Sequence, residues 1–151
     1  VSERSIERAR FAGNDLLARF RDAVAFLEFE QVPVKEVSAT VVATAVEQCK
    51  ASFVVSTDSV YGWSQIKTAL VEKFGPNLAF DSDLAALSLI GEGLNRSNTT
   101  LLETVDLLVK QHIAVSGVTT TSFRISLLVP RDRIEESVRL CHGRWTAARS
   151  A

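Results

Sequence analysis

Cysteine and histidine are scarce, with two of each among 151 residues. Cys49 and Cys141 stand alone without a CxxC motif, so we expect no disulfide framework and predict two small buried side chains. His112 and His142 have no Asp, Glu or Cys at metal-ligand spacing and are predicted at the surface or at helix ends. The sequence therefore predicts no metal site and no cofactor.

An excess of one charge and long apolar runs are also missing. The net charge of −1 gives no basic footprint for nucleic acid. No apolar run approaches the ~20 residues that span a bilayer, and the first residues lack the pattern of a signal peptide. We therefore expect a cytoplasmic protein with no nucleic-acid and no membrane partner.

Catalytic motifs are absent as well. The chain has no P-loop, no GxSxG and no HExxH. With two histidines and no cysteine in a recognisable nucleophile context, we expect no catalysis by this chain.

Apolar residues at helical spacing predict four amphipathic helices. The first begins after Asn14 as cap and ends before Pro33; the second covers about 59–74 and stops at Gly75-Pro76; the third starts at Asn98 or Thr99; the fourth starts after Pro130 with Asp132 as cap.

Apolar or alternating runs between these helices predict strands. They cover 6–11, 32–37, 51–55, 84–90, 113–118 and 123–129, and 77–83 is either a bridging strand or a linker. The elements then read strand–helix–strand–strand–helix twice, with a longer segment around 39–49 in the first copy. This order predicts an α+β fold of two tandem ferredoxin-like βαββαβ domains, 1–83 and 84–151, each an antiparallel sheet with helices on one face.

Helices cover only one face of such a sheet, so the other face needs another partner to bury its apolar residues. Leu128 and Val54 would otherwise be exposed there, so we expect a homodimer formed through sheets or helices.

Two other functions of the fold stay open. An acylphosphatase-like enzyme needs a phosphate-binding glycine-rich loop, for which Gly13-Asn14-Asp15 is a poor candidate. An RNA-binding plait needs aromatic residues on its middle strands, which offer only Phe53 and Phe123 without clustered Lys or Arg.

One local motif suggests a ligand. A predicted strand ends in Gly91-Glu92-Gly93, a polar loop follows, and a helix begins. The two glycines permit close backbone approach, and free N–H groups at a helix start can bind a carboxylate. Most GxG turns are only turns, so the position at a strand-to-helix loop gives this motif its value.

Several segments resemble the C-terminal regulatory region of aspartate kinases, which consists of tandem ACT domains. The resemblance is specific in the second half, over 87–94 (LSLIGEGL), 113–116 (IAVS), 120–129 (TTSFRISLLV) and 138–142 (VRLCH). In the first half 16–20 (LLARF) and 32–35 (VPVK) are similar to the family's corresponding segments but more diverged.

The resemblance implies a regulatory module that dimerises, binds lysine or threonine at domain interfaces and acts on an amino-acid kinase domain or catalytic subunit, which this chain does not contain. The implied effector-binding residues lie in the strand-to-helix loops and next to them. They are Gly13, Asp15, Leu16, Leu17, Val34, Lys35, Ser38 and Thr40 in the first copy, and Gly91, Glu92, Gly93, Asn95, Asn98, Thr99 and Thr120 in the second.

This chain departs from the family pattern at several of these positions. The family's Pro-Gly at the helix start is replaced by Asn98-Thr99 and by Asp15-Leu16, and Lys35 aligns with an aspartate that meets the ligand's amino groups in lysine-sensitive members. A lysine there would repel a cationic ligand by roughly 1 kcal/mol. We therefore expect threonine or another small amino acid as effector. The alternative is a degenerate ACT pair that serves only oligomerisation or protein interaction.

Overall fold

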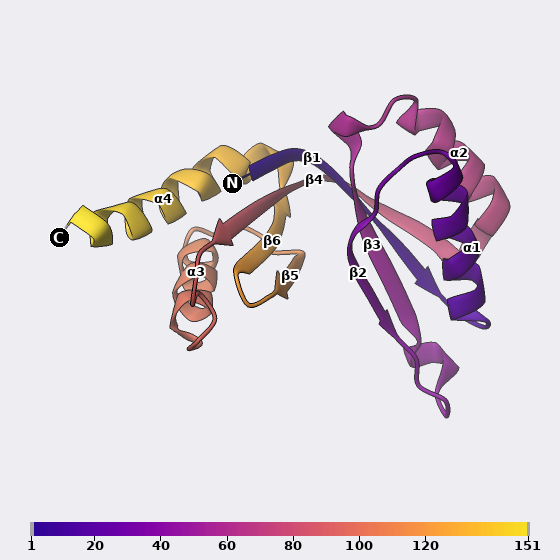
Figure 1. Cartoon of the computed structure of the whole chain (residues 1–151), viewed down its shortest axis with the longest axis horizontal. Coiled ribbons are helices and arrows are strands. Elements are labelled where there is room, and N and C mark those ends of the chain that lie inside the picture. Colours follow the sequence, from indigo (N-terminus) through magenta and orange to yellow (C-terminus); the bar gives the residue numbers. More distant parts are fainter. Residues whose placement is uncertain (1, 151) are drawn as a thin grey trace. The chain divides into compact units, whose positions relative to one another are not determined.

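The computed structural model describes the backbone of residues 2–150 and the side chains of residues 2–145. The helices and strands, in chain order (Figure 1), are β1 (Ser2–Ala12), α1 (Leu16–Phe29), β2 (Lys35–Thr40), β3 (Lys50–Ser56), α2 (Trp63–Phe74), β4 (Leu78–Ile90), α3 (Thr99–Lys110), β5 (Gly117–Thr120), β6 (Arg124–Pro130) and α4 (Ile134–Ser150). None of the helices in this range is long and apolar enough to cross a membrane.

The chain divides into two compact units. One is Ile6–Ser82, called the 6–82 unit below; the other, the 83–150 unit, also includes residues 2–5. Hydrogen bonds join the strands in the order β2-β3-β1-β4-β6-β5, so the 6–82 unit has the order β2-β3-β1-β4 and the 83–150 unit the order β1-β4-β6-β5. This is the strand order of the predicted ferredoxin-like fold in each unit.

The long strands β1 and β4 each contribute to both units. The 6–82 unit obtains its last strand from the beginning of β4, and the 83–150 unit obtains its last strand from residues 2–5 of β1. The division of the chain into ACT-like domains 1–83 and 84–151 remains a prediction; the compact units differ from it in the placement of residues 2–5 and of Asp83.

Each unit has its own hydrophobic core between the sheet and two helices. In the 6–82 unit, the ring of Phe11 lies 5.8 Å from Phe20, 5.9 Å from Phe53 and 6.0 Å from Phe74. In this unit α1 and α2 cover one face of the sheet (Figure 1). The core of the 83–150 unit is mostly aliphatic. Its buried members come from β4, α3 and the turn after it, β6 and α4: Ala85, Leu87, Leu108, Ile113, Ile125, Leu127, Val129, Ile134 and Cys141. Both cysteines are buried, as predicted, and neither forms a disulfide.

Two predicted strands begin later than expected, because α1 and α3 end in the same turn. Val32 N–H donates to the Leu27 carbonyl (2.8 Å) and Gln31 N–H to that of Glu28 (3.0 Å). Gln31 is left-handed, with φ 61°, and the pair of bonds forms a Schellman motif. His112 (φ 55°) and the residue after it repeat this turn at the end of α3.

The residue that follows each left-handed position therefore anchors a helix end. Val32 and Ile113 are both 3% exposed, packed as the apolar residue that accompanies a Schellman motif. The prediction of strands from 32 and from 113 is wrong for this reason, and β2 and β5 start at Lys35 and Gly117.

The predicted helix starts also need correction. Asp15, rather than Asn14, precedes α1, in a left-handed conformation and without a side-chain cap. The fourth helix opens with a 3₁₀ turn, Arg131–Arg133, so Asp132 lies inside the turn and not at the cap. Leu128 and Val54, expected to need cover from a second copy, are 3% and 4% exposed within the single chain, so they no longer argue for the homodimer, which stays a prediction.

Candidate functional site

The loop between β1 and α1 is fixed by its glycine and by one arginine. Gly13 has φ +99°, and a Cβ there would meet Asn77 Oδ1 at 3.0 Å and Arg19 Nη2 at 3.2 Å. The same Arg19 Nη2 donates to the carbonyl of Ala12 (2.9 Å) and to that of Asn14. The positive φ favours glycine at this position, and an added Cβ would also have to displace the ends of the Asn77 and Arg19 side chains.

Helix α1 follows this loop, and its start offers two kinds of polar group, the backbone amides and the carboxylate of Asp15. The side chain of Asp15 makes no capping hydrogen bond, so the first amides of α1 receive no side-chain acceptor from it. Unpaired amides at a helix start favour a carboxylate. The carboxylate of Asp15 beside them favours an ammonium group.

The connection from β2 to β3 folds back into a compact hairpin beside Cys49. Val42 N–H donates to Cys49 Sγ (3.2 Å), and Cys49 N–H donates to the Val46 carbonyl (3.0 Å) at the end of the 3₁₀ helix Val46–Gln48. Cys49 is 6% exposed. The thiol thus serves as an anchor for this hairpin.

An open hollow of about 640 Å³ lies between the start of α1 and this hairpin. Its lining comes from two segments of the 6–82 unit: Gly13, Asn14, Asp15, Leu16, Leu17 and Ala18 from the loop and helix, and Val41, Val42, Ala43, Val46 and Cys49 from the hairpin. Leu17, Val41 and Val46 are about half exposed (52%, 55% and 45%). An apolar wall beside amides and one carboxylate suits a small amphipathic molecule.

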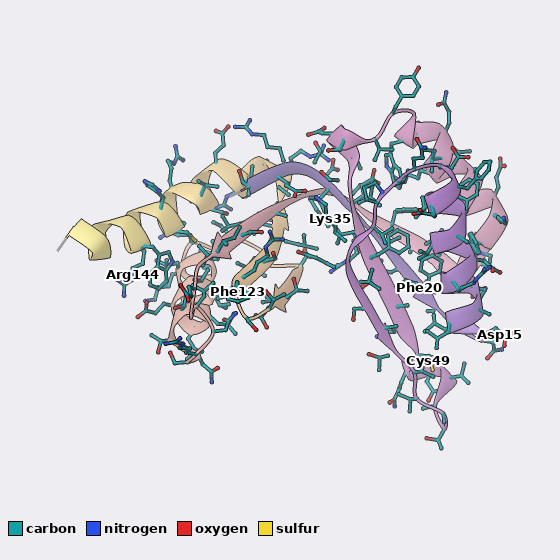
Figure 2. All side chains as sticks on the ribbon, in the orientation of Figure 1. Asp15, Phe20, Lys35, Cys49, Phe123 and Arg144 are labelled. Atoms are coloured by element: carbon teal, nitrogen blue, oxygen red, sulfur yellow. The ribbon has the colours of Figure 1, made fainter. Side chains whose placement is uncertain are left out.

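The structure brings together four of the eight residues predicted in the first copy. Gly13, Asp15, Leu16 and Leu17 line the hollow. Lys35 begins β2 opposite Val54, far from Asp15 (Figure 2). The others from β2 and before it lie elsewhere too: Ser38 is paired with Ser52, Thr40 is paired with Lys50, and Val34 packs against the core.

The predicted residues of the second copy cluster around a loop that is tied to the β5–β6 turn. Gly91 N–H donates to the Phe123 carbonyl (2.9 Å). Asn95 Nδ2 donates to the carbonyls of Thr121 and Arg124, the latter at 3.2 Å. Gly93 supplies a left-handed residue (φ +71°). This part of the loop is therefore held by its own hydrogen bonds.

The remaining predicted residues of this copy are exposed. Glu92, Asn98 and Thr99 lie on the surface, and Asn98 precedes α3 without a side-chain cap. Thr120 is an exposed residue of β5, paired with Ile125. The loop thus offers amides at the start of α3, while the hydrogen bonds of Asn95 to the β5–β6 turn give this residue a structural role.

Sequence reasoning missed the hairpin wall of the hollow. The extra length around 39–49 was the only sequence signal for this wall, because the wall forms when the hairpin brings Val42 into contact with Cys49.

A buried polar cluster around Glu7, in the same unit, was also not predicted from the sequence. Trp63 Nε1 donates to Glu7 Oε2 (2.5 Å), while Lys67 Nζ (2.5 Å) and Ser82 Oγ (2.7 Å) donate to Oε1.

This cluster sets the charge state of Glu7, which is 9% exposed. Burial raises the pKa of Glu7, but the hydrogen bonds from Lys67, Ser82 and Trp63, together with the charge of Lys67, outweigh it and hold the pKa below its ordinary value. Glu7 is therefore ionised near neutral pH and satisfied on both oxygens. No group of three or more His, Cys, Asp or Glu side chains that could hold a metal occurs among the described residues.

Two consecutive βαββαβ units with shared long strands define a tandem ferredoxin-like fold of the ACT type. No protein-family model matches the sequence, and no curated protein matches it either. Solved structures do match. The ligand-free regulatory subunit of aspartate kinase from Thermus thermophilus is 15% identical, with a TM-score of 0.75 and 94% of each chain covered.

Complete kinases contain the same fold. The aspartate kinase of Clostridium acetobutylicum is 12% identical (TM-score 0.77), with 95% of this chain and 33% of that chain covered. Escherichia coli aspartokinase III, in complex with lysine and aspartate, is 14% identical (TM-score 0.68), with 93% and 31% covered. This chain has the fold of aspartate kinase regulatory subunits, and its 151 residues are too few to hold a kinase domain as well.

Proposed function

We propose that this chain is a non-catalytic allosteric module of the aspartate-kinase type, which binds a small amino acid and transmits its presence to a kinase domain or catalytic subunit. The observation that carries the proposal is the hollow between the start of α1 and the Val41–Cys49 hairpin, in a fold shared with aspartate kinase regulatory subunits. The predicted location of effectors at interfaces between ACT domains is part of the same proposal.

The lining supports a small neutral amino acid better than lysine. The α-carboxylate can accept from the first amides of α1, and the α-ammonium can pair with Asp15. Among the lining residues Asp15 is the single carboxylate, so the second ammonium of lysine finds no partner there. The apolar residues Leu17, Val41 and Val46 fit a short side chain with a methyl group, as in threonine. Lys35 does not line the hollow, so it has no part in this preference.

The test is calorimetry of the chain with each of the twenty amino acids. We expect saturable heat with threonine or another small neutral amino acid at millimolar concentration or below, and several-fold weaker binding of lysine, since its second ammonium finds no carboxylate partner among the lining residues. Asp15→Asn should weaken binding several-fold, while Asp22→Asn, on the exposed side of α1 beside Arg21 (3.2 Å), should not. If no amino acid gives saturable heat, the effector part of the proposal is wrong.

Self-association is the second part of the proposal. Leu102 and Val109 lie two turns apart on α3 and are 60% and 58% exposed, an apolar stripe that a second copy of the chain could cover. A homodimer should sediment as such at micromolar concentration, and Leu102→Lys should shift it toward monomer. A monomer of the unchanged chain at that concentration would contradict dimerisation but leave effector binding testable.

A further inference from the structure

On the face of the 6–82 sheet opposite α1 and α2, the region around Arg10 and Lys50 is polar and positively charged. Ala9, Phe11, Ala51 and Phe53 belong to the core under the helices, so the residues that alternate with them along β1 and β3 lie on the other face. Strand pairing sets these residues in rows. Ser38, Ser52 and Arg10 form one row across β2, β3 and β1, and Thr40, Lys50 and Ala12 form the next.

A hollow of about 360 Å³ lies over these rows, wholly within the 6–82 unit. Its lining combines cations, hydroxyls and an amide with a few small or apolar residues: Arg8, Arg10, Phe11, Ala12, Ser38, Thr40, Lys50, Ala51, Ser52, Pro76, Asn77 and Ala79. Three of these side chains are positive and none is a carboxylate. The volume lies within the range of small-molecule sites.

One carboxylate next to the hollow organises the two arginines. Asp81 Oδ2 accepts from Arg8 Nε (2.9 Å) and from Arg10 Nε (2.8 Å), and Asp81 Oδ1 accepts from Arg10 Nη2 (3.0 Å). Burial raises the pKa of Asp81, but its hydrogen bonds with Arg10 and Arg8 outweigh this and lower the pKa. Three cations and this one anion leave a formal charge of +2 around the hollow.

We propose that this hollow binds a small organic anion that carries a phosphate group. A phosphate has a charge of about −1.5 to −2 near pH 7 and accepts several hydrogen bonds, which matches the charge of +2 and the hydroxyls of Ser38, Thr40 and Ser52. Asp81 occupies the Nε–Nη2 side of the Arg10 guanidinium and fixes its orientation, and the remaining N–H groups of Arg10 suit phosphate oxygens. A zwitterionic amino acid has no net charge and cannot neutralise the charge of +2 around this hollow. The ligand class therefore differs from that of the hollow at the start of α1.

The position of Lys50 strengthens this argument. It lies diagonally across from Arg10 on the same face, because its direct partner is Ala12. Diagonal neighbours on paired strands lie about 7–8 Å apart, within reach of long side chains. One anion can therefore contact both Lys50 and Arg10, and because it binds the folded chain it should also stabilise the fold.

The test is a titration of the isotope-labelled chain with inorganic phosphate and then with glycerol 3-phosphate, followed by amide chemical shifts at constant ionic strength. Chloride and glycerol are the matched controls. We expect saturable shifts confined to 8–12, 38–40, 50–52 and 77–79. Arg10→Gln and Lys50→Gln should each weaken binding about tenfold or more, as expected for loss of a charged hydrogen bond, while Lys110→Gln, on an exposed residue of α3, should not.

Several outcomes would overturn the proposal. One is the absence of saturable shifts at these amides in the unchanged chain, a result that does not depend on how the variants fold. Others are equal affinity in Arg10→Gln and Lys110→Gln, or shifts centred on 13–17. Saturable binding of a polyglutamate peptide without binding of either phosphate would assign the face to an acidic protein segment instead.

Discussion

At the scale of single residues, Glu7 combines burial with a full negative charge. Its oxygens accept from the indole of Trp63, the ammonium of Lys67 and the hydroxyl of Ser82. Lys67 also lies 5.1 Å from the centre of the Phe80 ring, a cation–π distance. The carboxylate thus holds together β1, α2 and β4 of the 6–82 unit, and replacing it should cost stability.

Glu7→Gln should lower the free energy of unfolding by about 1–3 kcal/mol near neutral pH, because a charged hydrogen-bond acceptor is lost while Lys67 stays in place. The folded state holds the pKa of Glu7 below its ordinary value of 4.5. Its contribution is therefore complete above that value and is lost as the pH falls through the folded-state pKa. Denaturant titrations of both proteins across this range should show the difference shrinking in acid.

Glu136→Gln is the matched control for this prediction. Glu136 pairs with Arg133 (2.8 Å) on the surface of α4 and its preceding turn, where an ion pair contributes little. Its replacement should leave the free energy of unfolding nearly unchanged. A constant difference between Glu7→Gln and the unchanged chain down to strongly acidic pH would show that Glu7 acts through shape and not through charge.

The role of Glu7 could not be read from the sequence, because its partners are 56, 60 and 75 positions away. A charged residue in a strand normally indicates the exposed face, and the alternation of Ile6, Arg8 and Arg10 therefore gave only a weak strand prediction. Asp81 presents the same difficulty. The sequence left 77–83 open between a bridging strand and a linker, because the arginine partners of Asp81 come from the distant strand β1.

At the scale of elements, the sequence predicts the middle of a helix or strand better than its first and last residues. The alternation along 123–129 and the apolar run 84–90 identify β6 and most of β4, because burial dictates each residue there. Gly75 ends α2 as predicted. Helix ends at Gln31 and His112 were missed because both residues adopt a left-handed conformation that is usual for glycine.

The β1–α1 loop gives a prediction at this scale. Gly13→Ala should lower the free energy of unfolding by about 1–2 kcal/mol, since alanine is strained at a positive φ and its Cβ would contact Asn77 and Arg19. Gly143→Ala, within α4 and with nothing within 4 Å of the added Cβ, should instead raise it by about 0.5–1 kcal/mol. Thermal unfolding of the two variants measures both changes in stability. A change of the same sign in Gly13→Ala and Gly143→Ala would contradict the left-handed conformation assigned to Gly13.

At the scale of the whole molecule, the repeat of strand–helix–strand–strand–helix was sufficient to predict two ferredoxin-like units. It could not show which strand completes each unit. In the 83–150 unit that strand is residues 2–5, more than 75 positions from the rest in sequence. The carbonyl of Arg4 accepts from Arg131 Nε (3.1 Å), and Arg4 also pairs with Glu135 (3.1 Å). Only the sheet order reveals this arrangement.

Removal of residues 1–5 should therefore lower the stability of the 83–150 unit, although the rest of that unit is distant in sequence. Without its last strand, the second half of β4 becomes a sheet edge with unpaired backbone groups. Hydrogen exchange should accelerate most in 84–90 and 124–130, while amides of β3 in the 6–82 unit keep their protection. Arg4→Ala, which removes an exposed side chain but retains the strand, should change exchange little. Uniform acceleration throughout the chain would mean that the two units unfold as one cooperative structure.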